Sequence, residues 1–280
     1  MGSFPEAIEV FKNISRLYSQ DAALSQKAEY EIADCYFRMG NEKEALARFN
    51  ALRAKYPDTS LTAEIMWWLG EYYYRQNDLP LAIRYFTSLI QDFSQSNLVL
   101  DAYYALGTIY AQESKYEQAV ASFTRVIESG TSDLASQAAV AIADIYVQQG
   151  DFSKAVALYQ EKVKENSGLA HLIYPKIAEI FCREGKYDES LELYRKSLKL
   201  VPLRQMADIQ FKIADIVQTQ GKSLEAVEEY LKVLYLYSGN KDLEVKSLLR
   251  VAALYEDQDN IPEAVKVYLR ISAMDVPEAK

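Results

Sequence analysis

A short pattern recurs along the whole chain at a nearly constant interval. A small residue, Ala or Ser, is followed four positions later by an aromatic residue. The eight pairs are Ala7/Phe11, Ala45/Phe49, Ala82/Phe86, Ala119/Phe123, Ala155/Tyr159, Ser190/Tyr194, Ala226/Tyr230 and Ala264/Tyr268. Successive small residues lie 35 to 38 positions apart. One such unit is too small to cover its own apolar face, so the pattern predicts a stack of similar units.

A second recurring stretch precedes each small residue and divides the unit into two helices. It places apolar, small and aromatic residues on one helix face, as in Ile32-Ala33-x-x-Tyr36 and Leu69-Gly70-x-x-Tyr73. Turn residues separate the two stretches at Gly40-Asn41, Asn77-Asp78, Gly150-Asp151, Gly185-Lys186 and Gly221-Lys222. With only 10 Gly and 7 Pro in the chain, the sequence favours an all-α fold.

These stretches resemble the tetratricopeptide repeat (TPR), whose pattern runs Leu-Gly-x-x-Tyr, then Ala-x-x-x-Phe, and closes on Pro. The matching residues of the best two repeats are Leu69, Gly70, Tyr73, Ala82 and Phe86, then Leu106, Gly107, Tyr110, Ala119 and Phe123. The closing proline is present as Pro57 and Pro202, whereas Val217 replaces the Tyr of one unit. The resemblance implies an all-α, right-handed α-solenoid of antiparallel helix pairs, a TPR superhelix.

The repeat pattern covers residues 1–280 as a single TPR solenoid. Residues 4–20 align with a second helix alone and predict a leading half repeat, while 26–280 predict about seven full repeats. The last unit stops just after Pro277 without a polar capping helix, although solenoids normally protect both ends. We expect the chain to be a fragment of a longer protein; alternatively, the helix around Ala7 is an unusual cap.

The charge balance argues against nucleic acid and membrane partners. The net charge is −9, and no Lys/Arg-rich run provides the basic surface that nucleic acid requires. An anionic membrane surface would repel the chain for the same reason. No apolar stretch approaches the roughly 18–20 residues that span a bilayer, so we expect no membrane insertion. The chain start has neither the positive nor the apolar region of a signal peptide.

The sequence contains no arrangement of residues that indicates catalysis, a metal site or a cofactor. His171 is the only histidine and has no Ser or Cys nucleophile signature nearby. Cys35 and Cys182 fit no metal spacing, and Cys182 falls inside a predicted first helix, where a packed thiol is the default. No Gly-rich phosphate loop is present. We therefore expect no enzyme activity.

The TPR resemblance implies that the first helices of successive units line a concave groove in which partners bind. Counting back from each small residue gives the groove positions. The predicted partner-binding residues are Tyr30, Asp34, Phe37, Trp67, Glu71, Tyr74, Tyr104, Thr108, Asp144, Phe211 and Asp215. The N-terminal half of this set is aromatic, and one position is acidic in five units, Glu179 included. This combination predicts a peptide partner with apolar anchors and basic or amide groups.

The acids have a second interpretation that needs no partner. Asp34/Arg38, Glu71/Arg75 and Glu179/Arg183 stand four apart with the acid first, an order that suits ion pairs within one helix. Asp144 and Asp215 are followed at that offset by Gln148 and Thr219. Adjacent Trp67 and Trp68 point about 100° apart, so at least one should be core, and we expect Trp67 in the groove.

Two family resemblances narrow the class of TPR protein. Some TPR domains bind the C-terminal carboxylate of chaperones through Lys, Asn and Arg, but this chain carries Tyr30, Asp34, Trp67 and Glu71 at such positions. The segment from Tyr56-Pro57 to Trp67-Trp68-Leu69-Gly70-Glu71 resembles bacterial envelope TPR proteins of the Tol–Pal and outer-membrane assembly systems. That resemblance favours a bacterial protein of the periplasm or cell envelope over the cytoplasm.

These observations favour a non-catalytic scaffold that binds a peptide or helix of a partner protein in its groove. Two alternatives remain open at this stage. The solenoid ends are apolar and could join copies into a homo-oligomer. The chain could also be the tethering domain of a larger multi-domain protein.

Overall fold

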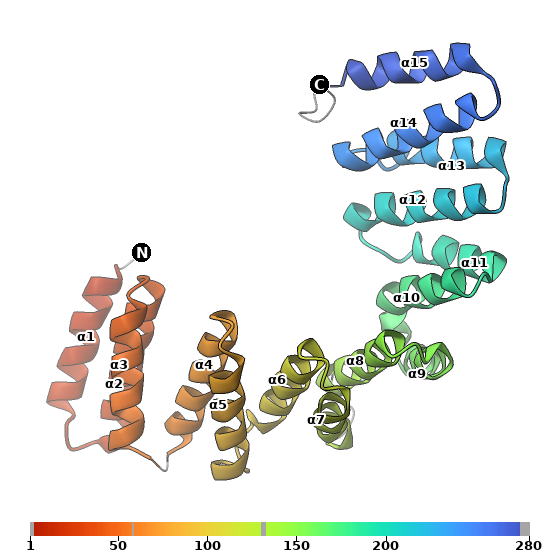
Figure 1. The fold of residues 1–280 in the computed structure, drawn as a ribbon. Helices are drawn as coiled ribbons and strands as arrows, with labels where there is room; N and C mark the ends of the chain where they lie inside the picture. The colour runs from red at the N-terminus through yellow and green to blue at the C-terminus, as the bar shows by residue number, and fades with distance from the viewer. Residues whose placement is uncertain (1–2, 58, 130–132, 275–280) are drawn as a thin grey trace. The chain divides into compact units, whose positions relative to one another are not determined.

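The structure, a computed structural model, describes residues 3–57, 59–129 and 133–274. Within these ranges the chain is all-helical, with fifteen α-helices that follow one another as consecutive antiparallel pairs (Figure 1). The predicted fold class of a helical-repeat solenoid is therefore confirmed. The contacts divide the chain into two units, residues 1–145 and 146–280, which are described separately.

The first unit begins with an unpaired helix and continues with helix pairs. Its helices are α1 (Phe4–Leu17), α2 (Ala22–Arg38), α3 (Glu42–Lys55), α4 (Ser60–Arg75), α5 (Leu79–Asp92), α6 (Val99–Gln112), α7 (Tyr116–Glu128) and most of α8 (Asp133–Gln148). Helix α1 packs on α2 through Ile8, which contacts Ile32 and Cys35. Pairs α2/α3, α4/α5 and α6/α7 follow, so α2, α4 and α6 are the first helices of their repeats.

The second unit contains the remaining helices. They are α9 (Phe152–Glu165), a short 3₁₀ turn (Ser167–Leu169), α10 (Ala170–Arg183), α11 (Tyr187–Ser197), α12 (Leu203–Thr219), α13 (Ser223–Tyr235), α14 (Lys241–Glu256) and α15 (Ile261–Ser272). Pairs α10/α11, α12/α13 and α14/α15 repeat the arrangement of the first unit. Pro277, at the predicted end of the last repeat, lies outside the described residues.

The recurring small and aromatic residues form the core of each pair. Ala45, Ala82 and Ala119 are fully buried, which lets the two helices of a pair approach closely. In the second unit Ser190 takes this place, and its hydroxyl donates to the carbonyl of Ala178 at 2.7 Å. A buried polar group is thereby satisfied across the helix pair.

The recurring aromatic residue is fully buried in the second helices α3, α5, α7, α9, α11 and α13. A tyrosine at such a position often keeps its hydroxyl near solvent. Tyr159, Tyr194 and Tyr230 are instead fully buried, at the positions that Phe49, Phe86 and Phe123 occupy in the first unit. The hydroxyls of Tyr194 and Tyr230 donate to Glu179 and Asp215, so burial does not leave them without a partner.

The turns within the helix pairs confirm the predicted breakpoints. Gly40 and Gly150 adopt positive φ, as does Asn77 at the equivalent place. The next residue then caps the second helix, as where Asp78 accepts the backbone N–H of Leu81. Ser114 and Asp259 also adopt positive φ, although neither residue type had indicated a turn of this kind.

Candidate functional site

The predicted groove residues lie on the first helices of their repeats, and all of them are half-buried. Helix α2 carries Tyr30, Asp34 and Phe37; α4 carries Trp67, Glu71 and Tyr74; α6 carries Tyr104 and Thr108; α8 carries Asp144; and α12 carries Phe211 and Asp215. A half-buried side chain is held by its neighbours and still presents surface to a partner. We call the surface of α2, α4 and α6 that carries these residues the first-helix face.

Three equivalent aromatic residues form a row on this face, and each is fixed by the second helix of its own repeat. Tyr30 packs against Phe49 with ring centroids 5.2 Å apart, Trp67 against Phe86 at 5.2 Å, and Tyr104 against Phe123 at 5.3 Å. Such contacts contribute about 0.5–1.5 kcal/mol each beyond area burial. The aromatic row, Tyr30, Trp67 and Tyr104, is therefore held in one orientation.

The other tryptophan joins two repeats. Trp68 packs edge-on to Phe37 of α2 at 4.9 Å and against Phe49 of α3 at 4.3 Å. The guanidinium of Arg75 lies 5.0 Å from the centre of the Phe37 ring, so both contacts bind Phe37 to α4. Phe37 is thus engaged between repeats. Neither tryptophan is fully buried, but Trp68 makes the inter-repeat contacts expected of a core residue.

The acids of the first unit differ in how far they are neutralised. Asp34 forms the predicted pair with Arg38, at 2.6 Å between Oδ2 and Nε. Glu71 does not pair with Arg75, because that guanidinium lies over Phe37. Among the described residues no cation lies within 4.0 Å of the Glu71 carboxylate. Thr108, at the same position of the next repeat, donates to the Tyr104 carbonyl at 3.0 Å.

The acids of the second unit are neutralised by their surroundings. Glu179 accepts the Tyr194 hydroxyl at 3.1 Å and Lys212 Nζ at 2.9 Å, and Arg183 lies at 3.5 Å. Burial would raise the pKa of Glu179, but these cations and the tyrosine outweigh it and hold the pKa below its ordinary value. The predicted helix-internal pair Glu179/Arg183 is present, although it is only one of three contacts.

Asp215 has an equivalent set of partners. The Tyr230 hydroxyl donates to its Oδ1 at 2.5 Å, and Arg250 Nε lies 4.0 Å away on α14. Burial first, and then the carboxylate, raise the pKa of Tyr230, so the hydroxyl stays protonated. At the offset of four residues that favours an ion pair within one helix, Asp215 is followed by Thr219. Its partners lie 15 and 35 positions further along the chain.

A regular spacing could have shown these contacts in advance. In both repeats the acid stands 15 positions before the tyrosine of the second helix. The same spacing in the first unit joins Asp34 to Phe49 and Glu71 to Phe86, where no hydroxyl is available. The positions that hold Lys212 and Arg250 in the second unit hold Trp68 and Ala105 in the first. Glu179 and Asp215 are thus neutralised by residues of the following repeat, whereas Glu71 of the first unit has no cation within 4.0 Å among the described residues.

Two adjoining depressions share Ser60 and Glu64 in their walls, and we call them the Glu64 hollows; Tyr30 lines the smaller one. The smaller, of about 250 Å³, lies between α2 and α4. The larger, of about 580 Å³, lies between the start of α4 and the loop from α5 to α6. Burial, followed by the charges of Glu64, Asp34 and Glu31, raises the pKa of Tyr30 to about 12. Three carboxylates therefore lie near enough to this ring to affect its hydroxyl.

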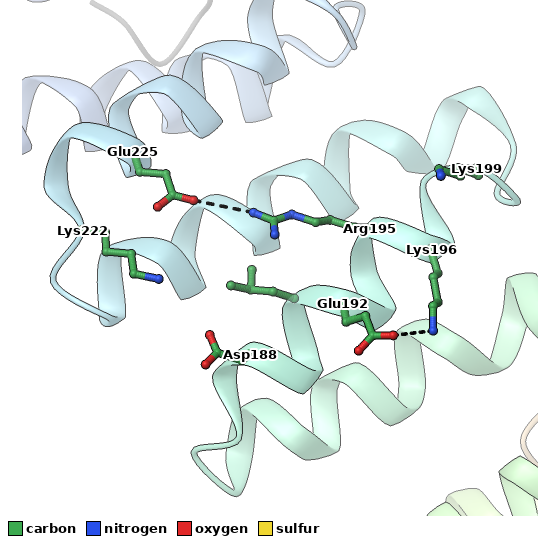
Figure 2. Close-up of a pocket in the computed structure, with 8 residues that line it drawn as sticks. Asp188, Glu192, Arg195, Lys196, Lys199, Lys222 and Glu225 are labelled. Atoms are coloured by element: carbon green, nitrogen blue, oxygen red, sulfur yellow. Dashed lines mark hydrogen bonds and ion pairs between the residues drawn. The ribbon is translucent and has the colours of Figure 1, made fainter.

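A charged pocket of about 380 Å³ lies on the second helices α11 and α13 of the second unit (Figure 2). Its opposite charges are largely paired with one another. Figure 2 shows Arg195 reaching Glu225, at 3.6 Å, and Lys196 reaching Glu192, at 2.6 Å. Asp188 accepts the side-chain amide of Gln220 at 2.9 Å. Because most of its charges are paired with one another, this pocket offers a ligand less than the first-helix face does.

The described residues contain no group of three or more His, Cys, Asp or Glu side chains that could hold a metal ion. In the same ranges, none of the helices is both long and apolar enough to cross a membrane. His171 Nδ1 lies 2.7 Å from the carbonyl of Gly168, where it closes the turn that begins α10. Burial raises the thiol pKa of Cys35 and of Cys182, which keeps both in the less reactive thiol form.

Comparison with protein families identifies the repeat. A family model described as tetratricopeptide repeat matches residues 30–97 and 104–170, and a second model with the same description matches residues 176–205. These matches together cover more than half of the chain. Among curated proteins, none matches the chain.

Solved structures of MamA share the fold. One is 14% identical, with 62% of this chain and 90% of that chain covered at a TM-score of 0.50. Another is 19% identical, with 60% and 93% covered and the same TM-score. At these identities the likeness shows the helical-repeat fold alone. It lends no support to the resemblance to Tol–Pal proteins.

Proposed function

The chain belongs to the tetratricopeptide-repeat proteins, and we propose that it is a non-catalytic scaffold that binds a segment of a partner protein on the first-helix face of residues 1–145. The observation that carries this proposal is the aromatic row of Tyr30, Trp67 and Tyr104. Each ring is held by an aromatic residue of the second helix and is still half-exposed. It therefore loses little conformational entropy when a partner packs on it, which favours binding.

The acids of the same face favour a partner with basic or amide groups. Glu71 lies on the same helix as Trp67, and no cation of the described chain neutralises it. Glu179 and Asp215 in the second unit already hold cations and tyrosine hydroxyls. A partner would have to displace those contacts to use either acid. The first unit is therefore the better docking surface, although Phe211 repeats the aromatic contact by packing on Tyr230 at 5.4 Å.

Site-specific photo-crosslinking tests the proposal. A photoreactive phenylalanine analogue at Tyr74, beside the aromatic row, should form crosslinks to a discrete partner segment. Trp67→Ala and Tyr104→Ala should reduce the yield at least tenfold, because each removes one anchor. Leu224→Ala, an exposed apolar residue of α13, serves as the matched control and should leave the yield unchanged. Equal yields from all these variants would eliminate the aromatic row as the site.

The compartment belongs to the proposal as well. The resemblance of the segment around Tyr56-Pro57 and Trp67-Trp68 to bacterial envelope TPR proteins supports a partner in the periplasm or envelope. Fractionation of cells that produce the natural full-length protein would test this. Recovery in the cytoplasmic fraction alone would refute it.

A second candidate function is self-association through the outer face of α15. Val265 and Leu269 are 48% and 65% exposed on this face. The equivalent of Val265 in the preceding repeat, Val227, is only 5% exposed, because later helices cover it. Two copies could bury these faces against each other in an isologous contact. A tethering role within a larger protein is compatible with either candidate.

Sedimentation velocity distinguishes self-association from a monomeric scaffold. The natural chain should form dimers as its concentration rises, and Val265→Glu/Leu269→Glu should stay monomeric while remaining helical. A monomer at all concentrations for the unaltered chain would exclude this candidate. It would leave the first-helix face unaffected.

A further inference from the structure

The Glu64 hollows extend the first-helix face toward the starts of α2 and α4. Ala23, Gln26, Lys27 and Tyr30 of α2 form one wall of the smaller hollow. The shared wall, Ser60 and Glu64, belongs to α4. The larger hollow continues to Phe93 and the polar loop residues Ser94, Gln95 and Asn97. A chain segment that packs on Tyr30 can therefore continue across α4 without leaving a concave surface.

The charges that line the hollows are mostly negative and lack partners. Glu31 and Glu64 line the smaller hollow, and Glu64 and Asp92 line the larger. Lys27 is the one cation among the described residues of both walls. Within the described ranges, no cation lies within 4.0 Å of any of the three carboxylates. They remain available to an incoming positive charge. After burial, which is the larger cause, Glu64 and Glu31 also contribute to the raised pKa of Tyr30.

The uncharged part of the lining suits a peptide backbone with apolar side chains. Tyr30 and Leu61 provide apolar surface in the smaller hollow, and Phe93 provides it in the larger. Ser94, Gln95 and Asn97 offer side-chain hydrogen bonds to main-chain groups. Successive side chains of an extended peptide point to opposite sides. A peptide that alternates apolar and cationic residues can therefore place the apolar ones on the rings and the cationic ones beside the carboxylates of the hollows.

We propose that the Glu64 hollows bind an extended, cationic segment of the partner, with Lys or Arg side chains beside Glu31, Glu64 and Asp92 and apolar side chains on Tyr30 and Phe93. The inference rests on the proposed function, because Tyr30 belongs to both surfaces. It adds the place where the cationic side chains bind and the extended conformation of the segment.

Fluorescence anisotropy with two labelled peptides tests the inference. Both are about eight residues long, enough to cross two repeats when extended. One alternates Lys with Leu and the other alternates Glu with Leu. The full chain should bind the Lys peptide at least tenfold more tightly at low salt. Raising the salt to about 0.5 M should remove most of this preference, since exposed charges are then screened.

Variants locate the binding of the Lys peptide. Glu31→Gln/Glu64→Gln should weaken it about tenfold, while Glu189→Gln, an exposed acid of α11, should not change it. Carbodiimide coupling should join a peptide lysine to Glu64, as read by mass spectrometry. This readout requires no folded variant. Equal affinity for both peptides, or coupling only outside the hollows, would overturn the inference.

The same measurements separate the inference from the proposed function. If Trp67→Ala weakens both peptides equally and neither is preferred, the aromatic row binds partners but the cationic inference is wrong. If the Lys peptide is preferred and depends on Glu31 and Glu64, yet ignores Trp67→Ala, the inference stands and the aromatic row fails.

Discussion

A single hydroxyl distinguishes the cores of the two units. Phe49, Phe86 and Phe123 fill the second-helix position of the first unit with carbon alone. Tyr194 and Tyr230 fill it in the second unit and donate to acids of the first helix. Because the ring is buried and the acceptor is half-exposed, each tyrosine links the core to the first-helix surface. The acid is then held in one place.

Replacing Tyr194 by Phe should destabilise the chain by about 1 kcal/mol, the net value of a hydrogen bond whose acceptor can still reach water. Urea unfolding monitored by circular dichroism measures the change. Tyr18→Phe is the control, because Tyr18 is exposed and its hydroxyl has no partner among the described residues. Equal stability of Tyr194→Phe and the unaltered chain would show that this hydroxyl contributes nothing.

A close approach of backbone and ring explains two glycines inside helices. A Cβ at Gly70 would lie 2.5 Å from the Phe86 ring, and one at Gly107 would lie 2.7 Å from Phe123. Gly70→Ala would normally stabilise a helix, yet here overpacking should cost about 1–3 kcal/mol. The same unfolding measurement applies. Phe86→Leu should reduce the loss of stability caused by Gly70→Ala, because it removes the ring that the new Cβ would meet. If the changes in unfolding free energy of the two variants simply add in the double variant, the steric clash is contradicted.

Turns within the helix pairs offer a reciprocal test. Ser114 adopts φ 58° where most equivalent positions hold Gly, such as Gly150 at φ 78°. Left-handed backbone costs a residue with a side chain about 1–2 kcal/mol. Ser114→Gly should therefore stabilise α6/α7, although the greater conformational entropy of Gly in the unfolded chain reduces the gain. Gly150→Ser should destabilise the chain by about 1 kcal/mol. Thermal unfolding should move in opposite directions for the two variants. A shift of the same sign would contradict the strain.

The helix pairs were predictable from sequence because their signals are local. Ala45 and Phe49 mark one helix, Gly40 marks the turn before it, and the interval repeats. The turn at Ser114 was missed because serine rarely adopts positive φ, and the preceding helices impose it there. The site was predictable only as far as the first-helix positions. Glu179 and Asp215 are neutralised by Lys212 and Arg250, each from the following repeat, and the residue spacing within one helix does not indicate such contacts.

Contacts between successive first helices neutralise Glu179 and Asp215 in the second unit, whereas among the described residues no cation lies within 4.0 Å of Glu71 in the first. Glu179 pairs with Lys212 of α12, and Asp215 faces Arg250 of α14. In the first unit Trp68 and Ala105 occupy the equivalent places. Stability in the second unit should therefore depend on the charge of its acids. Partner binding should depend on charge in the first unit.

Lowering the pH should weaken the contribution of Glu179 to the stability of the chain. Lys212, Tyr194 and Arg183 lower the folded-state pKa of Glu179 despite burial, so the ionised carboxylate favours folding. A group of this kind contributes its full stability above its unfolded pKa of about 4.3 and loses it as pH falls through the lower, folded pKa. Glu179→Gln should therefore be less stable than the unaltered chain at pH 7, and the gap should close below about pH 4. Urea unfolding at several pH values measures the gap.

Lys212→Met provides the matched control for this prediction. Without the ammonium group, Glu179 loses its nearest cation, and its pKa should move back toward the ordinary value. Glu179→Gln introduced beside Lys212→Met should then cost less at pH 7 and show a weaker dependence on pH. A gap that stays constant from pH 7 to about pH 3 would contradict the assignment. The line of first-helix ion pairs would then have no measurable effect on the stability of the molecule.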